Sequence, residues 1–424
     1  MTLIVVSILL LFGAVVKQCD LKIWRIKSGR RRALCRLLPL PLLIASLAMV
    51  LGSCKGVEDP QKITHPIMSL ISHIESSHEL ALHSVGSEDL LYARELARKL
   101  ASSTEILTLG EPEGEEHQVF GQITDIKLDR GGNLYVLDAA YSTVRIYDSE
   151  GLYKYSIGSP GRGPGEFFMP EDLEVDSLGR VYVIDKTSRK TIFKRVANGH
   201  ELEQVITLPI TPFELCSDGG TLYVHGTSSE ESSNVIFTYT SDGNSLGAFG
   251  TVYESPSSVV RYFFEQGKIA CTHSPGKIIY ASGLLPVIHS YSLEGDIQWT
   301  ARIPNFKMLN IVENKGATPD QSSVTMNVRS NAHDQIATVV PFPAKHVILQ
   351  VSSFTPESID NSDRGEGERF VELLSYLVIA QTGEAVYIGH SLPRIVAITE
   401  DHFYTKQTSP YPKITVHSYN SAGE

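Results

Sequence analysis

The sequence repeats itself at a fixed spacing in its middle third. Tyr135 and Tyr182, and likewise Asp138 and Asp185, are pairs of matching residues that lie 47 positions apart. Around each pair, four short runs alternate apolar and polar residues and are separated by turns containing glycine or aspartate. Alternation with a period of two indicates strands with one buried face. Four strands in every ~40–50 residues are typical of a ring of four-stranded blades, the β-propeller.

The repeat continues beyond these two copies. A third, weaker copy contains Tyr223, which lies 41 residues after Tyr182. We expect further copies near residues 259–303, 321–381 and 385–419. The fifth carries a polar insertion at 356–368, and in the last, residues 385–388 repeat the tyrosine strand. The last copy has three clear strands, and pairing it with the run 105–109 would close the ring and remove both free edges.

We therefore expect an all-β, six-bladed propeller of four-stranded antiparallel blades over residues 104–424. Five or seven blades also fit the weaker copies. Within 66–101, apolar residues at helical spacing on either side of Gly86 predict two short helices, which either pack on the propeller or form a stalk.

Charge is distributed unevenly along the chain. The net charge is −11, but residues 1–53 hold eight basic residues and one acidic residue, Asp20. The remaining chain has 29 basic and 47 acidic residues, a net charge of −18. An acidic body of this kind repels phosphate backbones, so nucleic acid is not an expected partner.

The N-terminal region carries a targeting pattern. A basic stretch at 27–36 precedes an apolar run at 37–51, which ends in Leu51, Gly52, Ser53 and Cys54. This arrangement resembles a bacterial lipoprotein signal, whose final cysteine is acylated. It implies a signal region at 1–53, lipidation of Cys54, a tether at 54–103, and a location in the cell envelope outside the cytoplasm.

Alternatives remain open for this region. The chain could instead have a plain membrane anchor, although the short run and its two prolines, Pro39 and Pro41, disfavour a spanning helix. Lys55 after the cysteine favours the outer membrane. A first apolar run at 3–16 either precedes a true translation start near Leu21 or forms an extra membrane segment.

The second repeat carries a recognisable motif. Residues 158–167 read Gly-Ser-Pro-Gly-Arg-Gly-Pro-Gly-Glu-Phe and are followed by Pro170, an Asp-x-x-Gly turn at 176–179 and a Tyr-Val-x-Asp strand that ends at Asp185. This pattern resembles an NHL repeat, and the layout is similar to six-bladed propeller lipoproteins of Bacteroidetes-type bacteria. We expect Phe167 to fill the space between two blades. Asp138 and Asp185 would then accept hydrogen bonds from nearby turn amides.

The same residues also define a candidate ligand site. In a propeller, the loops between blades and the loops joining second and third strands emerge on one face. A mixed-charge ring at the channel mouth is therefore expected from seven side chains: Asp138, Arg162, Glu166, Glu171, Asp185, Arg189 and His390. A polar funnel of this kind suits a small polar ligand, a glycan or a peptide.

Function is expected to be binding and not catalysis. No dinucleotide fingerprint, Walker loop or nucleophile elbow is evident, and no cofactor is expected. The alternatives are a periplasmic metal-dependent lyase or lactone-type hydrolase, with calcium or zinc at the mouth, and an accessory subunit of an envelope complex. Outside the signal region the chain has two cysteines, Cys216 and Cys271, which we expect to be buried and unpaired.

Overall fold

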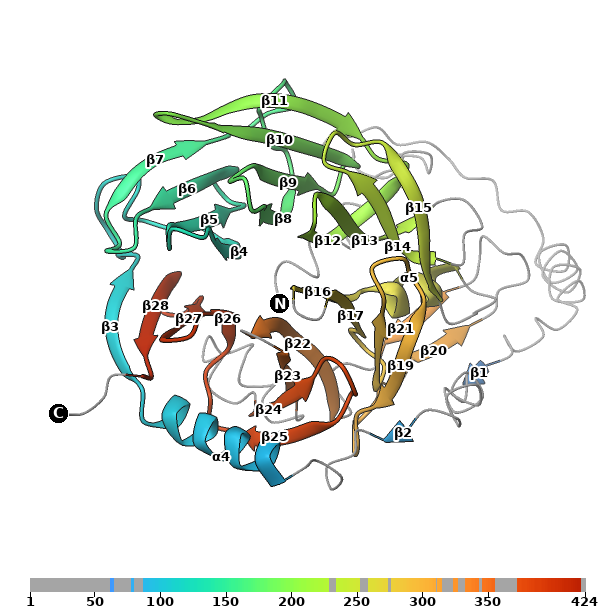
Figure 1. The fold of residues 1–424 in the computed structure, drawn as a ribbon. Helices are drawn as coiled ribbons and strands as arrows, with labels where there is room; N and C mark the ends of the chain where they lie inside the picture. Colours follow the sequence, from blue (N-terminus) through green and yellow to red (C-terminus); the bar gives the residue numbers. More distant parts are fainter. Residues whose placement is uncertain are drawn as a thin grey trace, which may run out of the picture.

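The described strands form a ring around a common axis (Figure 1). The structure is a computed structural model that describes residues 62–64, 78–79, 87–228, 234–251, 258–273, 276–309, 311–314, 323–326, 332–342, 345–354 and 372–420. Six sheets, each built on four consecutive antiparallel strands of the ring, make the blades of a β-propeller. The innermost strand of each blade contacts those of both neighbours. The expected six-bladed, all-β fold is confirmed.

The blades follow the chain in order. Blade 1 consists of β4 (Ile123–Leu128), β5 (Leu134–Asp138), β6 (Thr143–Tyr147) and β7 (Tyr153–Ile157). Blade 2 consists of β8 (Pro170–Val175), β9 (Val181–Asp185), β10 (Arg189–Val196) and β11 (Gly199–Thr207). Blade 3 consists of β12 (Ile210–Asp218), β13 (Thr221–Ser228), β14 (Asn234–Thr240) and β15 (Ser245–Thr251).

The second half of the ring has the same plan. Blade 4 consists of β16 (Gly267–His273), β17 (Gly276–Ser282), β18 (Val287–Tyr291) and β19 (Ile297–Arg302). Blade 5 consists of β22 (His333–Phe342), β23 (His346–Phe354), β24 (Glu372–Ile379) and β25 (Ala385–Gly389). Blade 6 consists of β26 (Ile395–Ile398), β27 (His402–Gln407), β28 (Lys413–Ser418) and β3 (Thr104–Leu109).

Other elements lie outside this plan. β2 (His78–Glu79) adds a parallel strand to the outer edge of blade 4 by pairing with β19. β1 (Lys62–Thr64), β20 (Ile311–Asn314) and β21 (Ser323–Met326) form a small separate sheet. Helix α5 (Ser258–Glu265) precedes blade 4, so this blade begins at Gly267 and not at residue 259 as expected.

The ring closes through strands from opposite ends of the propeller. β3 pairs antiparallel with β28, from Leu109 opposite Ile414 to Thr104 opposite Ser418. The predicted pairing of the run 105–109 with the last blade is therefore confirmed. The pairing gives blade 6 its fourth, outermost strand. We call the junction between blade 6 and blade 1 the seam.

One strand was assigned to the wrong blade. Residues 385–388 were expected to repeat the tyrosine strand of the last blade, but they belong to β25, the outer strand of blade 5. Tyr387 lies opposite Tyr376 of β24. The polar insertion expected at 356–368 falls outside the described residues.

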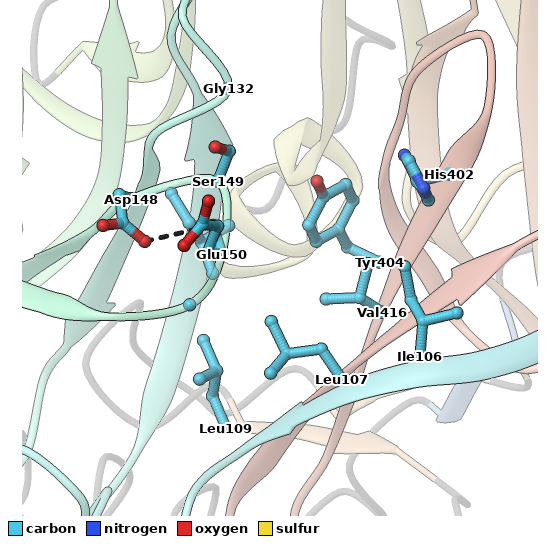
Figure 2. Close-up of a pocket in the computed structure, with 12 residues that line it drawn as sticks. Ile106, Leu107, Leu109, Gly132, Asp148, Ser149, Glu150, His402, Tyr404 and Val416 are labelled. Atoms are coloured by element: carbon cyan, nitrogen blue, oxygen red, sulfur yellow. Dashed lines mark hydrogen bonds between the residues drawn. The ribbon is translucent and has the colours of Figure 1, made fainter.

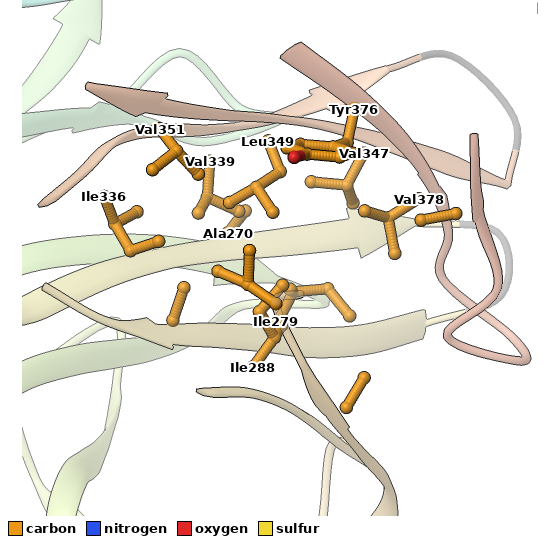
Figure 3. Packing of buried hydrophobic residues seen from close by; sticks show 14 of the residues in the cluster. Ala270, Ile279, Ile288, Ile336, Val339, Val347, Leu349, Val351, Tyr376 and Val378 are labelled. Carbon is orange, nitrogen blue, oxygen red and sulfur yellow. The ribbon is translucent and has the colours of Figure 1, made fainter. Parts of the chain in front are cut away.

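Buried side chains fill the spaces between neighbouring blades. Between blades 4 and 5, for example, Ile279 and Ile288 face Val347 and Leu349 across two sheets (Figure 3). Between blades 1 and 2, Phe167 is 1% exposed and lies in the cluster shared by both blades, as expected. Such apolar clusters between sheets supply most of the driving force for closing the ring.

A disulfide joins the innermost strands of blades 3 and 4. Cys216 on β12 and Cys271 on β16 are bonded, with their Cα atoms 5.6 Å apart. The expectation of two unpaired thiols is wrong. The two cysteines are 55 residues apart in sequence. Their proximity follows from adjacent blade positions, which spacing alone does not reveal.

Helix α4 (Ser87–Ala101) leads directly into β3 and packs on the ring. Ala93, Leu96 and Leu100 are buried against a cluster from blades 5 and 6. Of the two expected helices, the second is therefore α4, while the first lies outside the described residues. The apolar runs at 3–16 and 37–51 and Cys54 also lie outside them. Within the described part of the chain, no helix has the length and apolar character needed to cross a membrane.

Candidate functional site

Asp138 and Asp185, which were placed at the channel mouth, are buried and hold loops together. Asp138 accepts hydrogen bonds from the backbone N–H groups of Gly121 and Gln122 at 2.9 Å and pairs with Arg145 at 3.4 Å. Asp185 is the equivalent residue one repeat later. It accepts from the N–H groups of Phe168 and Met169 at 2.8 Å. Burial alone would raise the pKa of Asp185, but these amide donors outweigh it and lower the pKa.

Four other predicted residues gather around one loop between blades 1 and 2. The Glu166 carboxylate accepts from Gly163 N–H at 2.7 Å, and Arg189 Nη2 donates to Gly163 O at 2.9 Å. Arg162 lies over the ring of Phe168, 3.9 Å from its centre. Glu171 pairs with Lys186 at 2.7 Å. These residues share a face of the ring, but their polar groups mainly fix the loop.

His390 lies elsewhere. It follows β25, the outer strand of blade 5, so it is not the structural counterpart of Asp138 or Asp185. Its side chain is exposed, and its Nδ1 lies 3.1 Å from the hydroxyl of Tyr387. The seven predicted side chains therefore do not form one ring around the mouth.

A different group of charged side chains gathers at the propeller axis. We call it the axial charge belt; it comprises Asp125, Lys127, Asp172, Glu174, Glu214, Lys268, Arg394 and Lys406. Most of these residues stand on the innermost strands β4, β8, β12 and β16. The side chains of Lys127 and Lys268 keep 31% and 33% of their exposure, so the belt is reached by solvent and is not a sealed core.

Three carboxylates of the belt bind the next blade. Asp125 accepts from Leu173 N–H of blade 2 at 3.3 Å. In the same way, Asp172 accepts from Leu215 N–H at 2.8 Å, and Glu214 accepts from Ile269 N–H at 3.0 Å. Each acid follows a β-bulge in its own strand, which turns the side chain toward the neighbouring blade.

The cations of the belt come from blades 1, 4 and 6. Lys127 pairs with Asp125 at 3.3 Å, and Lys268 pairs with Glu214. Lys406 on β27 donates to Thr124 O of blade 1 at 2.5 Å. Arg394, just before β26, donates to Ala337 O at 2.8 Å.

Burial opposes ionisation in the belt, but neighbouring charges of opposite sign lower the pKa of Asp125 and raise those of Lys127 and Lys268. Burial, together with the neighbouring Asp125, raises the pKa of Asp172 well above its ordinary value, and Asp172 shares a hydrogen bond with Asp125. Burial also raises the pKa of Glu174 to about 7. The pKa of Lys406 is lowered to about 8, first by burial and then by Arg394.

The raised pKa values of Asp172 and Glu174 favour the protonated, neutral forms of these acids, and the raised pKa values of Lys127 and Lys268 favour the charged forms of these lysines. An anionic group is the ligand chemistry that this balance favours. Among the described residues, no three histidine, cysteine, aspartate or glutamate side chains are close enough together to hold a metal ion.

Sequence reasoning missed the belt, although a signal was present. Asp125 and Asp172 lie 47 residues apart, at the same repeat spacing as Asp138 and Asp185. Each stands in the first strand of its unit, two residues before another charged residue, Lys127 or Glu174. Charged residues recurring in the strand nearest the axis are the pattern that would have identified it.

Comparisons with known proteins agree with the fold. The family described as a 6-bladed beta-propeller matches residues 111–256. A protein from Bacteroides fragilis that is named as exported has a similar structure, with 11% identity, a TM-score of 0.51, and coverage of 80% of this chain and 97% of its own.

A member of the DUF4221 family from Bacteroides vulgatus is also similar, with 9% identity and a TM-score of 0.51 over 75% of this chain and 98% of its own. At these identities the likeness concerns the fold. The sequence matches none of the curated proteins with which it was compared.

Proposed function

We propose that this chain is a lipoprotein of the bacterial envelope whose propeller binds a ligand at its axis and does not catalyse a reaction. The ligand is small and polar and carries an anionic group, as an acidic glycan or a peptide carboxylate does. The observation that carries this proposal is the axial charge belt, in which four basic and four acidic side chains meet and the pKa values of two of the acids, Asp172 and Glu174, are raised toward their neutral forms.

The geometry of the belt supports binding at this place. Asp125, Asp172 and Glu214 each accept from a backbone N–H, so they are fixed by the fold. The lysines have long side chains and retain exposure, so they can turn toward a ligand that supplies a better anion. Several donors converging on one anionic group give both affinity and orientation.

Three observations support a location outside the cytoplasm. Residues 51–54 have the Leu-Gly-Ser-Cys pattern of a lipid attachment site. Cys216 and Cys271 form a disulfide, which persists in oxidising compartments. The similar Bacteroides fragilis protein is itself named as exported. We therefore assign the acylated cysteine to Cys54 and the propeller to the far side of the inner membrane.

Binding is tested with acidic and neutral glycan and peptide arrays probed with the full chain in detergent. The informative variant is Lys268→Gln, which removes one axial cation but leaves Ile269 N–H to hold Glu214. Lys277→Gln is the matched control, since Lys277 is a half-buried lysine of the same blade outside the belt and donates to Gln298 Oε1 at 2.9 Å. We expect Lys268→Gln to lose acidic ligands and Lys277→Gln to retain them. Equal profiles for all three proteins would contradict axial binding.

Lipidation is tested separately by labelling cells with a radioactive fatty acid. Label should enter the wild-type chain and the Cys35→Ser variant, but not Cys54→Ser. Label that persists in Cys54→Ser would remove the lipid-anchor assignment while leaving the binding proposal intact.

The non-catalytic assignment is tested by elemental analysis of the purified chain. About one calcium or zinc ion per chain, lost together with a hydrolase or lyase activity on chelation, would replace the binding module by an enzyme. Metal at background level is the expected result.

A further inference from the structure

A pocket opens at the seam (Figure 2). The turns of blade 1 that line it lie at the opposite ends of the strands from the loop that carries Arg162. Its volume is about 210 Å³. Blade 6 contributes side chains from β3, β27 and β28, and blade 1 contributes the turns that follow β4 and β6. The pocket therefore lies between the first and last blades and away from the axial charge belt.

The corresponding position is filled at other junctions of the ring. In each case a glycine in the turn between the third and fourth strands of one blade faces a large side chain on the outer strand of the preceding blade. The pairs are Gly199 with Tyr155, Gly243 with Ile206, Gly295 with Phe249, and Gly383 with Trp299. At the seam, Gly151 likewise faces the outer strand of the preceding blade, where the side chains are Leu107 and Leu109.

The junction between blades 1 and 2 shows how the space is closed elsewhere. There, His200 lies 2.9 Å from the hydroxyl of Tyr155 and 2.8 Å from Gly179 O. Gly132, which lines the seam pocket, is the equivalent of Gly179 one repeat of 47 residues earlier. The seam thus has leucine side chains where the next junction has a phenol ring, and a pocket beside Gly132 where the next junction has an imidazole beside Gly179.

The inner part of the pocket is apolar. Leu107, Leu109 and Val416 form its floor beside the ring of Tyr404 (Figure 2). Ile106 also lines it, because a β-bulge in β3 places three residues, 105–107, opposite Val416 and His417, where two would normally stand. Ile106 is 55% exposed, so the bulge presents an uncovered apolar surface to solvent at the pocket.

The rim is acidic. Glu150 and Asp148 stand on one side, and His402 stands on the other (Figure 2). Asp148 already accepts from the N–H groups of Glu150 and Leu152 at 3.0 and 2.9 Å, whereas the exposed Glu150 carboxylate has no partner among the described residues. The lining contains neither lysine nor arginine.

We propose that the seam pocket binds a small organic cation, with an apolar ring or chain against Leu107 and Val416 and an ammonium group at Glu150. Apolar burial supplies the attraction, and the unpaired carboxylate selects the charge. Such a ligand contacts both the first and the last blade, so it stabilises the closed ring. This site is independent of the anion site proposed at the axis.

The test uses benzylamine, benzyl alcohol and benzoate, which share a ring and differ in charge. Each is titrated against the full chain in detergent and phosphate buffer by saturation-transfer difference NMR, with empty micelles subtracted. We expect saturable binding of benzylamine, binding of the alcohol weaker by about tenfold for the lost charge-assisted contact, and no binding of benzoate.

Variants locate the binding. Leu107→Trp copies the residue type that fills the junction of blades 4 and 5 and should abolish binding. Glu150→Gln, at an exposed position that does not endanger folding, should reduce benzylamine affinity to that of the alcohol. Glu294→Gln is the matched control, because Glu294 holds the same position in the corresponding turn of blade 4, where Phe249 fills the space.

Three results would overturn the proposal: no saturable benzylamine binding, equal affinity for amine and alcohol in the wild type, or equal effects of Glu150→Gln and Glu294→Gln. Because the axial variant Lys268→Gln leaves the seam unchanged, its effect on acidic ligands and this test succeed or fail separately.

Discussion

Blades 1 and 2 on one side of the ring, and blades 5 and 6 on the other, are each joined to the next blade by a polar side chain. The side chain is a carboxylate in blades 1 and 2, but an amide or a lysine in blades 5 and 6. In the first pair, a carboxylate on an inner strand accepts a backbone N–H of the next blade, as Asp172 does from Leu215. In the second pair, Gln350 accepts from Ile395 N–H at 2.7 Å, and Lys406 donates to carbonyl groups of blade 1. Each of these four junctions therefore contains a polar bond, but the residue that makes the bond and its charge differ from one junction to the next.

Blades 1 and 2 also carry buried aspartates at the end of the second strand, and removing one should have the largest effect. Asp138→Ala leaves Arg145, which is 1% exposed, without its carboxylate and frees two loop amides. We expect a loss of about 3–5 kcal/mol in the free energy of unfolding, as for other broken buried pairs.

Urea denaturation measures this loss. The matched control is Gln407→Ala, at the end of the second strand of blade 6, where the side chain is exposed and a change below ~0.5 kcal/mol is expected. Similar losses at the two positions would mean that the aspartate has no special role in blade 1.

The disulfide lies between the two kinds of junction, at blades 3 and 4. Replacing Cys216 and Cys271 together by alanine should cost about 4 kcal/mol, because the bond closes a loop with a sequence separation of 55 residues. Reduction of the wild-type chain should give a loss of similar size in the same denaturation experiment. Unchanged stability after verified reduction would show that blade packing alone holds this junction.

Gln350 is the counterpart in blade 5 of the axial acids. It is fully buried and also donates to Ser375 Oγ at 3.0 Å and Pro393 O at 2.9 Å. Gln350→Leu leaves Ile395 N–H and Pro393 O unsatisfied, so we expect a loss of about 1–3 kcal/mol. Gln335→Leu, exposed on β22, is the control. A loss no greater than the control's would show that the 5–6 junction does not depend on this amide.

The pKa values of an acid in blade 2 and of a lysine in blade 6 are shifted in opposite directions, so we expect their contributions to stability to change with pH in opposite directions. Glu174 in blade 2 has its pKa raised from 4.5 to about 7, so the native state holds a proton that the unfolded chain has lost. Its contribution to stability therefore decreases as the pH rises through this interval. Lys406 in blade 6 has its pKa lowered from 10.5 to about 8. Its contribution increases between those values, because there the unfolded chain binds the extra proton.

Comparing each variant with the wild type at every pH separates the contribution of Glu174 or Lys406 from that of the buried histidines, which both proteins share. The free energy of unfolding of Glu174→Gln, subtracted from that of the wild type, should fall from pH 4.5 to 7 and then level off. The same difference for Lys406→Gln should rise from pH 8 to 10.5. If both free-energy differences changed with pH in the same direction, Glu174 and Lys406 would not make opposite contributions to stability.

The smallest effect is expected on the surface of blade 5. Asp89 of α4 pairs with Lys345 at 3.2 Å, and the lysine side chain is 52% exposed. Asp89→Asn should change the free energy of unfolding by about 0.5 kcal/mol or less, since solvent screens such pairs. Leu96→Ala on the buried face of the same helix should cost about 2–5 kcal/mol. A larger effect of Asp89→Asn than of Leu96→Ala would mean that charge, and not packing, holds the helix.

The junctions of blades 1 and 2, which repeat the same contacts, are also the ones that the sequence repeat predicted. Asp138 and Asp185 occupy equivalent positions because in both blades the loop amides need an acceptor. The turn glycines recur at the same spacing. This period predicted the strands, the number of blades and the closure of the ring. In blade 5 the local pattern of residues 385–388 fits a second strand as well as a fourth. The long insertion between β23 and β24 displaced the strand count, and so His390 was placed wrongly.

The candidate site was harder to predict than the fold for a physical reason. Cys216 with Cys271, and Lys406 with Thr124, are close only because the ring brings separate blades together. A single sequence shows which strand is innermost, but it does not show which side chains meet at the axis. Arg162 and Glu166 stand on one loop, and Arg189 of β10 donates to a carbonyl of that loop.

Helix α4 has a mechanical consequence for a protein held by its N-terminal end. A pull on the chain upstream of Ser87 would act on β3, the strand that closes the ring, if nothing lay between them. Ala93, Leu96 and Leu100 instead fix α4 to blades 5 and 6. In a chain anchored at Cys54, as proposed, tension is therefore resisted first by the pairing of β1 with β20 and of β2 with β19, and then by the packing of α4; β3 is loaded only after these contacts have separated.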